Sequence, residues 1–192
     1  MKTLAATCLV ATGLAAFGSA PAFGAAYAID VTHTFVNFEV LHLGISTSRG
    51  RFDKSEGTLE FERAARKGKV DITIDIASVN TGVPALDQQL KSDQFFDAGK
   101  FPNARFVADR FDFSGNKLAQ VSGAFTLLGK TLPLTLKATR FNCYPHPFLQ
   151  VEACGGDFEA TIQRTLWGMS TYAPDLVSDQ VRLVLQIEAL KQ

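Results

Sequence analysis

Histidine side chains are the first candidates for acid–base or metal chemistry in this chain of 192 residues, which contains His33, His42 and His146. A zinc site needs several protein ligands that converge on the ion. If residues 31–43 form one strand, His33 and His42 point to opposite faces and lie about 30 Å apart, at roughly 3.3 Å per residue. They then cannot share an ion, and the sequence predicts no metal site.

Motifs for other kinds of catalysis are missing. The sequence contains no Gly-x-Ser-x-Gly, no His-Glu-x-x-His, no phosphate-binding glycine-rich loop and no Cys-x-x-Cys-His haem attachment. We therefore expect no catalytic residues and no enzyme activity. A hydrolase or isomerase that acts through His42 is the catalytic alternative.

His42 is the histidine that we expect near a ligand. It continues the apolar face formed by every second residue of the segment 36–40, so it should point inward where that strand ends. Two interpretations stay open: a buried histidine bonded to a neighbouring residue, or one that meets the head group of a ligand.

Arg164 is a second polar residue expected on an inward face, since it continues the row of alternate residues in the segment 158–162. A buried guanidinium needs a partner that accepts its hydrogen bonds. We expect an ion pair with Asp87 or Asp97, in preference to contact with an anionic head group.

The N-terminus has the layout of a secretory signal peptide. Lys2 precedes an uncharged apolar run at residues 4–17, and small residues follow it. The run is shorter than the roughly 20 residues that cross a bilayer as a helix, which favours a cleaved signal over a membrane anchor. We expect a signal peptide at residues 1–26 with cleavage after Gly24 or Ala26, one domain at residues 27–192, and a periplasmic or secreted location.

The charge of the chain is balanced, with 19 basic and 19 acidic residues, and loss of Lys2 with the signal changes the balance by one. Nucleic acids and anionic membrane surfaces attract proteins with a marked basic excess. The composition therefore argues against both partners.

Two cysteines, Cys143 and Cys154, remain after removal of the signal. An even number in an oxidising compartment predicts a disulfide. Closing a loop of this length stabilises the fold by about 3 kcal/mol. A metal site that adds His146 is the rival interpretation, but it falls short of the four ligands of a structural zinc site.

Strict alternation of apolar and polar residues recurs along the chain and predicts about eight strands with one apolar face each. Such strands are typical of antiparallel sheets, and they fit either a sandwich or a closed barrel. Residues 84–92 predict one short helix, and the phenylalanines that follow it are interpreted as a plug or a lid. The strand-like segments are residues 36–40, 52–61, 70–76, 104–111, 121–127, 132–138, 158–162 and 181–187.

A set of short motifs in a fixed order links this chain to a known family. Together they resemble the YceI-like family of secreted polyisoprenoid-binding proteins, although Trp167 stands where that family usually has phenylalanine. Only part of the family carries a cysteine pair like the one seen here. The motifs lie in residues 27–30, 33–44, 50–52, 57–59, 78–82, 87–97, 101–106, 123–134 and 162–169.

The resemblance implies an all-β, eight-stranded antiparallel, lipocalin-like barrel with one short helix and an apolar tunnel. The tunnel would hold a polyprenyl lipid, an isoprenoid quinone or a similar long amphiphile. The resemblance also implies that the protein forms a homodimer. The inward-facing rows then supply the predicted ligand-binding residues: Val36, Phe38, Val40, His42, Phe52, Ile72, Ile74, Phe106, Phe125, Leu134, Leu136, Phe158, Ile162, Arg164, Trp167, Leu183 and Leu185.

Two functions of different classes therefore remain. The first is a periplasmic carrier or reservoir that holds an isoprenoid chain by burial of apolar surface, at roughly 25 cal/mol per Å². The second is an interaction module whose barrel is filled by its own side chains and whose outer face docks a membrane redox partner. Lipid in an organic extract of the purified protein would distinguish them.

Overall fold

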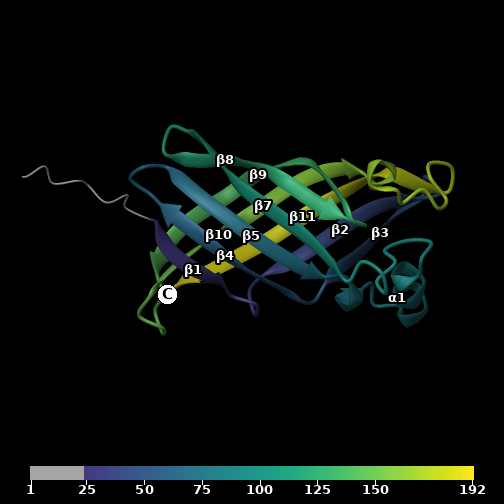
Figure 1. The fold of residues 1–192 in the computed structure, drawn as a ribbon, viewed down its shortest axis with the longest axis horizontal. Helices are drawn as coiled ribbons and strands as arrows, with labels where there is room; N and C mark the ends of the chain where they lie inside the picture. The colour runs from purple at the N-terminus through teal and green to yellow at the C-terminus, as the bar shows by residue number, and fades with distance from the viewer. Residues whose placement is uncertain (1–23) are drawn as a thin grey trace, which may run out of the picture.

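A computed structural model of the chain describes residues 24–192. The predicted signal peptide, apart from its last three residues, lies outside the described residues. Strands dominate the described part (Figure 1). The elements are β1 (Ala25–Ile29), β2 (Phe35–His42), β3 (Ser46–Phe52), β4 (Ser55–Glu62), β5 (Lys67–Asp75), η1 (Ile76–Ser78), β6 (Val79–Asn80), α1 (Pro84–Lys91), β7 (Asn103–Ser114), β8 (Lys117–Leu127), β9 (Lys130–Pro145), β10 (Glu152–Gln163), η2 (Arg164–Trp167) and β11 (Val177–Lys191).

The eleven strands form one antiparallel sheet that closes on itself, because β1 pairs with both β4 and β11. Three pairs of consecutive segments, β1 with β2, β3 with β4, and β5 with β6, each act as one interrupted strand. Both β1 and β2, for example, pair with the same edge of β11. The result is an eight-stranded barrel with up-and-down order, which confirms the predicted fold and excludes the sandwich.

Side-chain hydrogen bonds explain where two of these strands break. The carboxylate of Asp30 accepts bonds from the backbone N–H and the hydroxyl of Thr32, which forms a turn between β1 and β2. The Asp75 carboxylate accepts a bond from the N–H of Ala77 and so caps η1. Buried Thr34 restores pairing beyond the first break, because its hydroxyl exchanges hydrogen bonds with the backbone of Glu188.

Residues that alternate between apolar and polar in the sequence alternate between buried and partly covered positions in the barrel. In β5, for instance, Val70, Ile72 and Ile74 are buried, whereas the residues between them are only partly covered. The single α-helix lies where the sequence predicted it, and its first residue is Pro84. Among the described residues, no helix has the length and apolar character needed to span a bilayer.

The two ends of the barrel are built differently (Figure 1). The end that we call the mouth carries the turn at residues 43–45, α1 with the following loop, the turn at residues 128–129, and the segment 164–176. The end that we call the disulfide end carries the turns at residues 63–66, 115–116 and 146–151, the start of β1 and the C-terminus. There the predicted disulfide joins Cys143 and Cys154, which lie opposite one another on β9 and β10.

Candidate binding cavity

An apolar cavity of about 120 Å³ lies inside the barrel towards the mouth. All the strands except β1, β4 and β6 contribute residues to its wall, and α1 and the loop after it cover its outer end. Its wall contains one charged side chain, Arg164. The residues that line it are Val36, Phe38, Val40, Phe52, Ile72, Ile74, Ile76, Leu90, Phe95, Phe96, Ala104, Phe106, Phe125, Leu127, Leu134, Leu136, Ile162, Arg164, Met169, Val177, Val181, Leu183 and Leu185.

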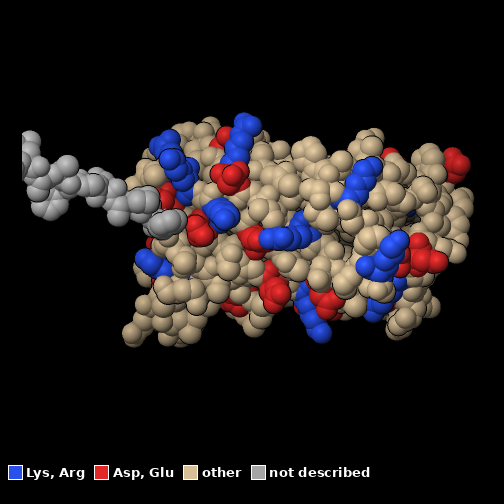
Figure 2. Space-filling model, viewed as in Figure 1, with Lys and Arg blue, Asp and Glu red and all other residues tan. Residues whose placement is uncertain are grey.

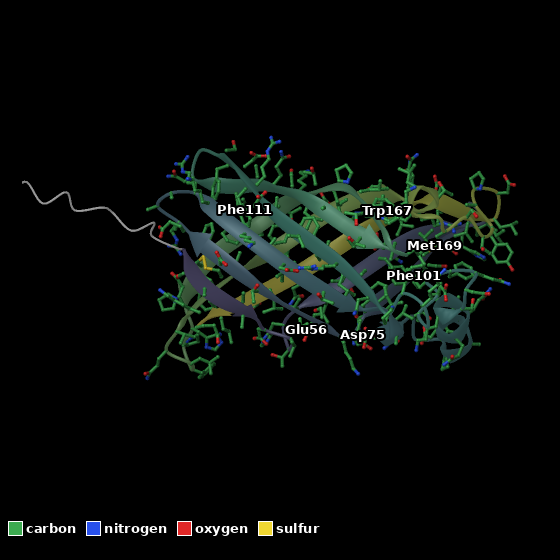
Figure 3. All side chains as sticks on the ribbon, in the orientation of Figure 1. Glu56, Asp75, Phe101, Phe111, Trp167 and Met169 are labelled. Atoms are coloured by element: carbon green, nitrogen blue, oxygen red, sulfur yellow. A yellow bond between two sulfur atoms is a disulfide. The ribbon has the colours of Figure 1, made fainter. Side chains whose placement is uncertain are left out.

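Most of the residues predicted from the sequence lie together on this wall, and three do not. Phe158 lies deeper and lines a second cavity. Trp167 is buried behind the wall, where its ring packs edge-on against Phe125 at 5.7 Å and its indole N–H donates to the Phe125 carbonyl at 3.3 Å. His42, the third, is exposed. The position of Trp167 near the mouth is visible in Figure 3.

The expectation that His42 extends the inward-facing row into the cavity is wrong. β2 keeps its register with β3 as far as His42, but the strand ends at this residue, and Leu41 beside it is exposed as well. His42 therefore lies in solvent at the end of its strand. His146 is likewise remote from the cavity, in the loop after β9, where its ring nitrogen Nδ1 accepts hydrogen bonds from the backbone N–H groups of Phe148 and Leu149.

Arg164 is buried as expected, with 3% of its surface exposed, but the expected ion pair with Asp87 or Asp97 does not form. Its guanidinium donates instead to three backbone carbonyls, those of Met169 at 3.0 Å, Val177 at 3.1 Å and Ser178 at 2.9 Å. Burial lowers the pKa of this guanidinium.

These bonds join η2 to the start of β11. Asp87 has a different role, because its carboxylate accepts hydrogen bonds from the backbone N–H and the hydroxyl of Thr81, both at 2.7 Å. Arg164 therefore fastens the segment that crosses the mouth, through the carbonyl of Met169 after η2 and the carbonyls of Val177 and Ser178 at the start of β11.

Several cavity residues were missed by the sequence analysis. Ile76, Leu127 and Val181 follow the alternation of their strands and could have been found from it. Leu90 and Met169 come from α1 and from the segment after η2, which have no period-two signal to reveal them.

The phenylalanines after α1 close the outer end of the cavity. Phe96 packs against Phe38 at 6.4 Å and Phe52 at 5.4 Å between ring centroids. Phe95 is buried and contacts Tyr172, at 6.2 Å, across the mouth. The hydroxyl of Thr171 also donates to the carbonyl of Gln94 at 2.7 Å. The helical segment and the segment before β11 thus meet over the cavity.

A second apolar cavity, of about 40 Å³, lies further along the barrel towards the disulfide end. Three residues line both cavities: Ile72, Phe106 and Leu136. We call them the partition, because their side chains separate two spaces that share one axis. An engineered apolar cavity of about 150 Å³ accepts benzene. The cavity at the mouth therefore suits one small apolar group, and a longer chain must displace the partition.

Beyond the second cavity the barrel is packed shut. Phe61 packs against Phe111 at 6.2 Å and against Phe141 at 5.4 Å between centroids. Figure 3 shows Phe111 at the disulfide end, far from the labelled residues of the mouth. Tyr27 is also buried here, and its hydroxyl donates to Glu152 at 2.5 Å. Burial and this hydrogen bond raise the pKa of Tyr27 to about 12.

Asp30, His33 and Glu188 form the one cluster among residues 24–192 whose ligand atoms lie close enough to hold a metal ion, within 4.8 Å of one another. The sequence predicted no metal site at these residues. The Asp30 carboxylate is already engaged by Thr32 and by the Nδ1 atom of His33 at 2.8 Å. Burial alone would raise the pKa of Asp30, but these hydrogen bonds outweigh it and lower the pKa to about 2. The cluster therefore serves the junction of β1 and β2.

The fold and the cavity define a class: a lipocalin-like barrel whose interior can receive an apolar group. A family model for the YceI-like domain matches residues 27–189. A UPF0312 protein of Pseudomonas paraeruginosa is 35% identical across the whole chain and 98% of its own length, and one from Pseudomonas syringae pv. tomato is 37% identical over 72% of each chain. The chain belongs to the YceI-like family.

Solved structures agree on the fold. The Campylobacter jejuni YceI protein matches with a TM-score of 0.65 and 28% identity, over 79% of this chain and 90% of that one. A polyisoprenoid binding domain from Saccharophagus degradans matches with a TM-score of 0.63 and 18% identity, over 88% and 99% of the two chains. At that identity the second likeness concerns the fold alone.

Proposed function

We propose that the mature protein is a periplasmic carrier or reservoir that holds the chain of an isoprenoid-type lipid along the barrel axis. The observation that carries this proposal is the apolar wall of the cavity, which continues past the partition into a second apolar space. Membership of the YceI-like family and the polyisoprenoid binding domain of Saccharophagus degradans support it.

Burial of the chain would supply the binding energy. Each buried methylene contributes about 0.8 kcal/mol, so a few prenyl units suffice for tight binding without any charged contact. Displacement of Ile72, Phe106 and Leu136 from their packed positions would offset part of this gain. We therefore expect a short chain to occupy the cavity at the mouth and a longer one to bind only as the partition moves.

The envelope location is part of the same proposal. The signal-like N-terminus supports it, and so does the disulfide, which persists in oxidising compartments. Cleavage after Gly24 would leave β1 whole, whereas cleavage after Ala26 would remove two residues that pair with β4. We expect the intact mass of the exported protein to correspond to an N-terminus at Ala25.

Mass spectrometry of an organic extract tests the function. The mature protein would be purified from the envelope without detergent and compared with a Phe106→Trp variant, in which the larger ring narrows the passage at the partition. We expect the extract of the native protein to contain a prenyl lipid or isoprenoid quinone. The extract of the variant should contain shorter chains or less lipid. An empty extract, combined with no rise in unfolding temperature on addition of prenyl alcohols, would exclude the carrier.

The small size of both cavities favours one alternative, an interaction module that docks a membrane redox partner and binds no lipid. In that case the same extraction yields no lipid, and widening the partition by Phe106→Ala does not increase the binding of prenyl alcohols. The assembly, for which the resemblance implies a homodimer, would be read from the mass of the purified protein in solution.

A further inference from the structure

Exposed apolar side chains gather at the mouth. We call Leu41, Leu43, Ile45, Tyr172 and Leu176 the mouth patch. Between 47% and 82% of each is exposed, and Ile45 is the most exposed of the five. Large apolar residues that stay in water as a group mark a site of interaction.

Backbone hydrogen bonds hold the two halves of the patch together. The N–H of Leu43, in the turn after β2, donates to the carbonyl of Leu176 at 2.7 Å. The N–H groups of Leu176 and Val177 in turn donate to the carbonyl of Tyr172, at 3.1 and 2.9 Å. The patch is therefore one surface made from two segments that are distant in the sequence.

The mouth patch is continuous with the wall of the cavity. Tyr172 packs on Phe95, and Val177 follows Leu176 directly. Both Phe95 and Val177 line the cavity. An apolar path thus runs from the exposed tip of Ile45 to the interior of the barrel.

The two segments of the patch carry little charge, unlike the wall of the barrel. Residues 40–48 contain no Lys, Arg, Asp or Glu, and Asp175 is the one such residue in the segment 165–176. On the wall, by contrast, basic and acidic side chains pair across neighbouring strands, as Arg182 does with Glu39 at 2.9 Å and Glu159 at 3.0 Å. Figure 2 shows both signs interspersed over the face in view, with no patch of a single sign.

We propose that the mouth patch inserts into the surface of a lipid bilayer, and that the bound chain passes between bilayer and barrel through it. This inference rests on the proposed function, because an apolar chain that crossed water would expose every methylene to the solvent, which is unfavourable. Direct contact between membrane and mouth removes that barrier.

The chemistry of the patch indicates how it binds. Apolar insertion needs no anionic lipid, and the charged residues next to the patch in the sequence have both signs: Glu39 and Asp175 are acidic, whereas Arg49 is basic. Binding should therefore depend little on salt. A second copy of the chain fits less well, since stable protein interfaces involve about 20 to 30 residues a side and the patch has only five.

Flotation of the mature protein with phosphatidylcholine vesicles tests the proposal. Ile45→Asp places a charge at the tip of the patch, whereas Phe148→Asp makes the same change at the disulfide end, where Phe148 is 87% exposed. Neither side chain is part of the core, so both variants should fold. We expect Ile45→Asp to lower the vesicle-bound fraction about tenfold or more, and Phe148→Asp to leave it unchanged.

Three outcomes would overturn the proposal. The first is an equal fall in the vesicle-bound fraction of both variants. The second is vesicle binding that requires anionic lipid and disappears at high salt. The third is native protein that is dimeric without vesicle binding and becomes monomeric on Ile45→Asp, since the patch would then join two copies of the chain.

A second measurement separates this inference from the function on which it rests. Titration of the protein with farnesol in solution reports on the cavity without a membrane. We expect Ile45→Asp to bind farnesol like the native protein but to transfer a prenyl chain between vesicles at least several-fold more slowly. Native protein that floats with vesicles and binds no farnesol would contradict the carrier and leave membrane docking intact, whereas farnesol binding without flotation would contradict docking alone.

Discussion

The mouth and the disulfide end of this barrel are closed by different means. At the disulfide end, Phe61 and its aromatic neighbours fill the axis, Tyr27 bonds to Glu152, and Cys143 and Cys154 join two strands covalently. At the mouth, a short helix and an irregular segment lie across a cavity that they do not fill.

One barrel thereby combines a stable end with an accessible one. Packed aromatic rings and a covalent bond are not easily moved, so they suit an end that stays shut. Contacts such as the one between Phe95 and Tyr172 join two loops, and loops can separate without loss of the sheet. We expect changes at the disulfide end to lower stability, and changes at the mouth to alter exchange of the ligand.

The largest effect is expected from Phe61→Ala, which empties the packed end. Loss of a fully buried phenylalanine lowers the free energy of unfolding by about 3–5 kcal/mol. The matched change Phe96→Ala at the half-buried cap should lower it by less, roughly 1–2 kcal/mol, and should alter farnesol binding. Urea unfolding and a farnesol titration measure both. A larger loss of stability for Phe96→Ala would reverse the assignment of the two ends.

Removal of the disulfide should come next. Replacement of Cys143 and Cys154 by alanine together is expected to lower the free energy of unfolding by about 3 kcal/mol, because the unfolded chain regains the freedom of a closed loop. Farnesol affinity should not change, since neither cysteine lines the cavity at the mouth. Unfolding with and without reductant checks the stability of the native protein. If the free energy of farnesol binding fell by as much as the free energy of unfolding, the two ends would be coupled.

Arg164→Lys should have a smaller effect, at the mouth. A lysine ammonium cannot reproduce the fork that reaches three carbonyls, so we expect a loss of about 2 kcal/mol. The segment 168–176 should also become more sensitive to protease, while the strands stay protected. Limited proteolysis followed by mass spectrometry locates the cuts. Cleavage at the disulfide end instead would contradict the fastening role of Arg164.

The smallest effect concerns pH. The pKa of Asp30 is lowered from 3.8 to about 2, so the folded state gains stability above pH 4 and loses it as the pH falls from about 4 to 2. We expect this contribution to be about 1 kcal/mol, because its partner His33 is largely exposed. In Asp30→Asn the free energy of unfolding should be lower at pH 6 and vary less between pH 4 and 2. An unchanged acid profile would exclude this contribution.

The sequence predicted the parts of the molecule that regular strands determine. Alternation identified the inward rows of β5, β9 and β11, and cysteine number with compartment identified the disulfide. His42 was misplaced because alternation tells which face of a strand a residue occupies but not where the wall of the barrel ends, and β2 ends at this residue. The partners of Arg164 could not be foreseen, since they are backbone carbonyls of two separate segments that meet only in the folded chain.

The size of the cavity also lay beyond the sequence. Periodicity tells which side chains face inward, but it does not tell how far Ile72, Phe106 and Leu136 reach across the axis. That reach depends on the barrel radius and on side-chain rotamers together. It divides the interior into two spaces where the sequence suggested one tunnel.

Quenching of Trp167 by a brominated prenyl alcohol tests the occupancy of the barrel most directly. Trp167 is the one tryptophan of the chain, and it packs on Phe125 of the cavity wall. We predict saturable quenching by the brominated chain, and displacement of that chain by its unbrominated counterpart. Fluorescence that stays constant up to the solubility limit of the brominated chain would contradict a lipid in the barrel.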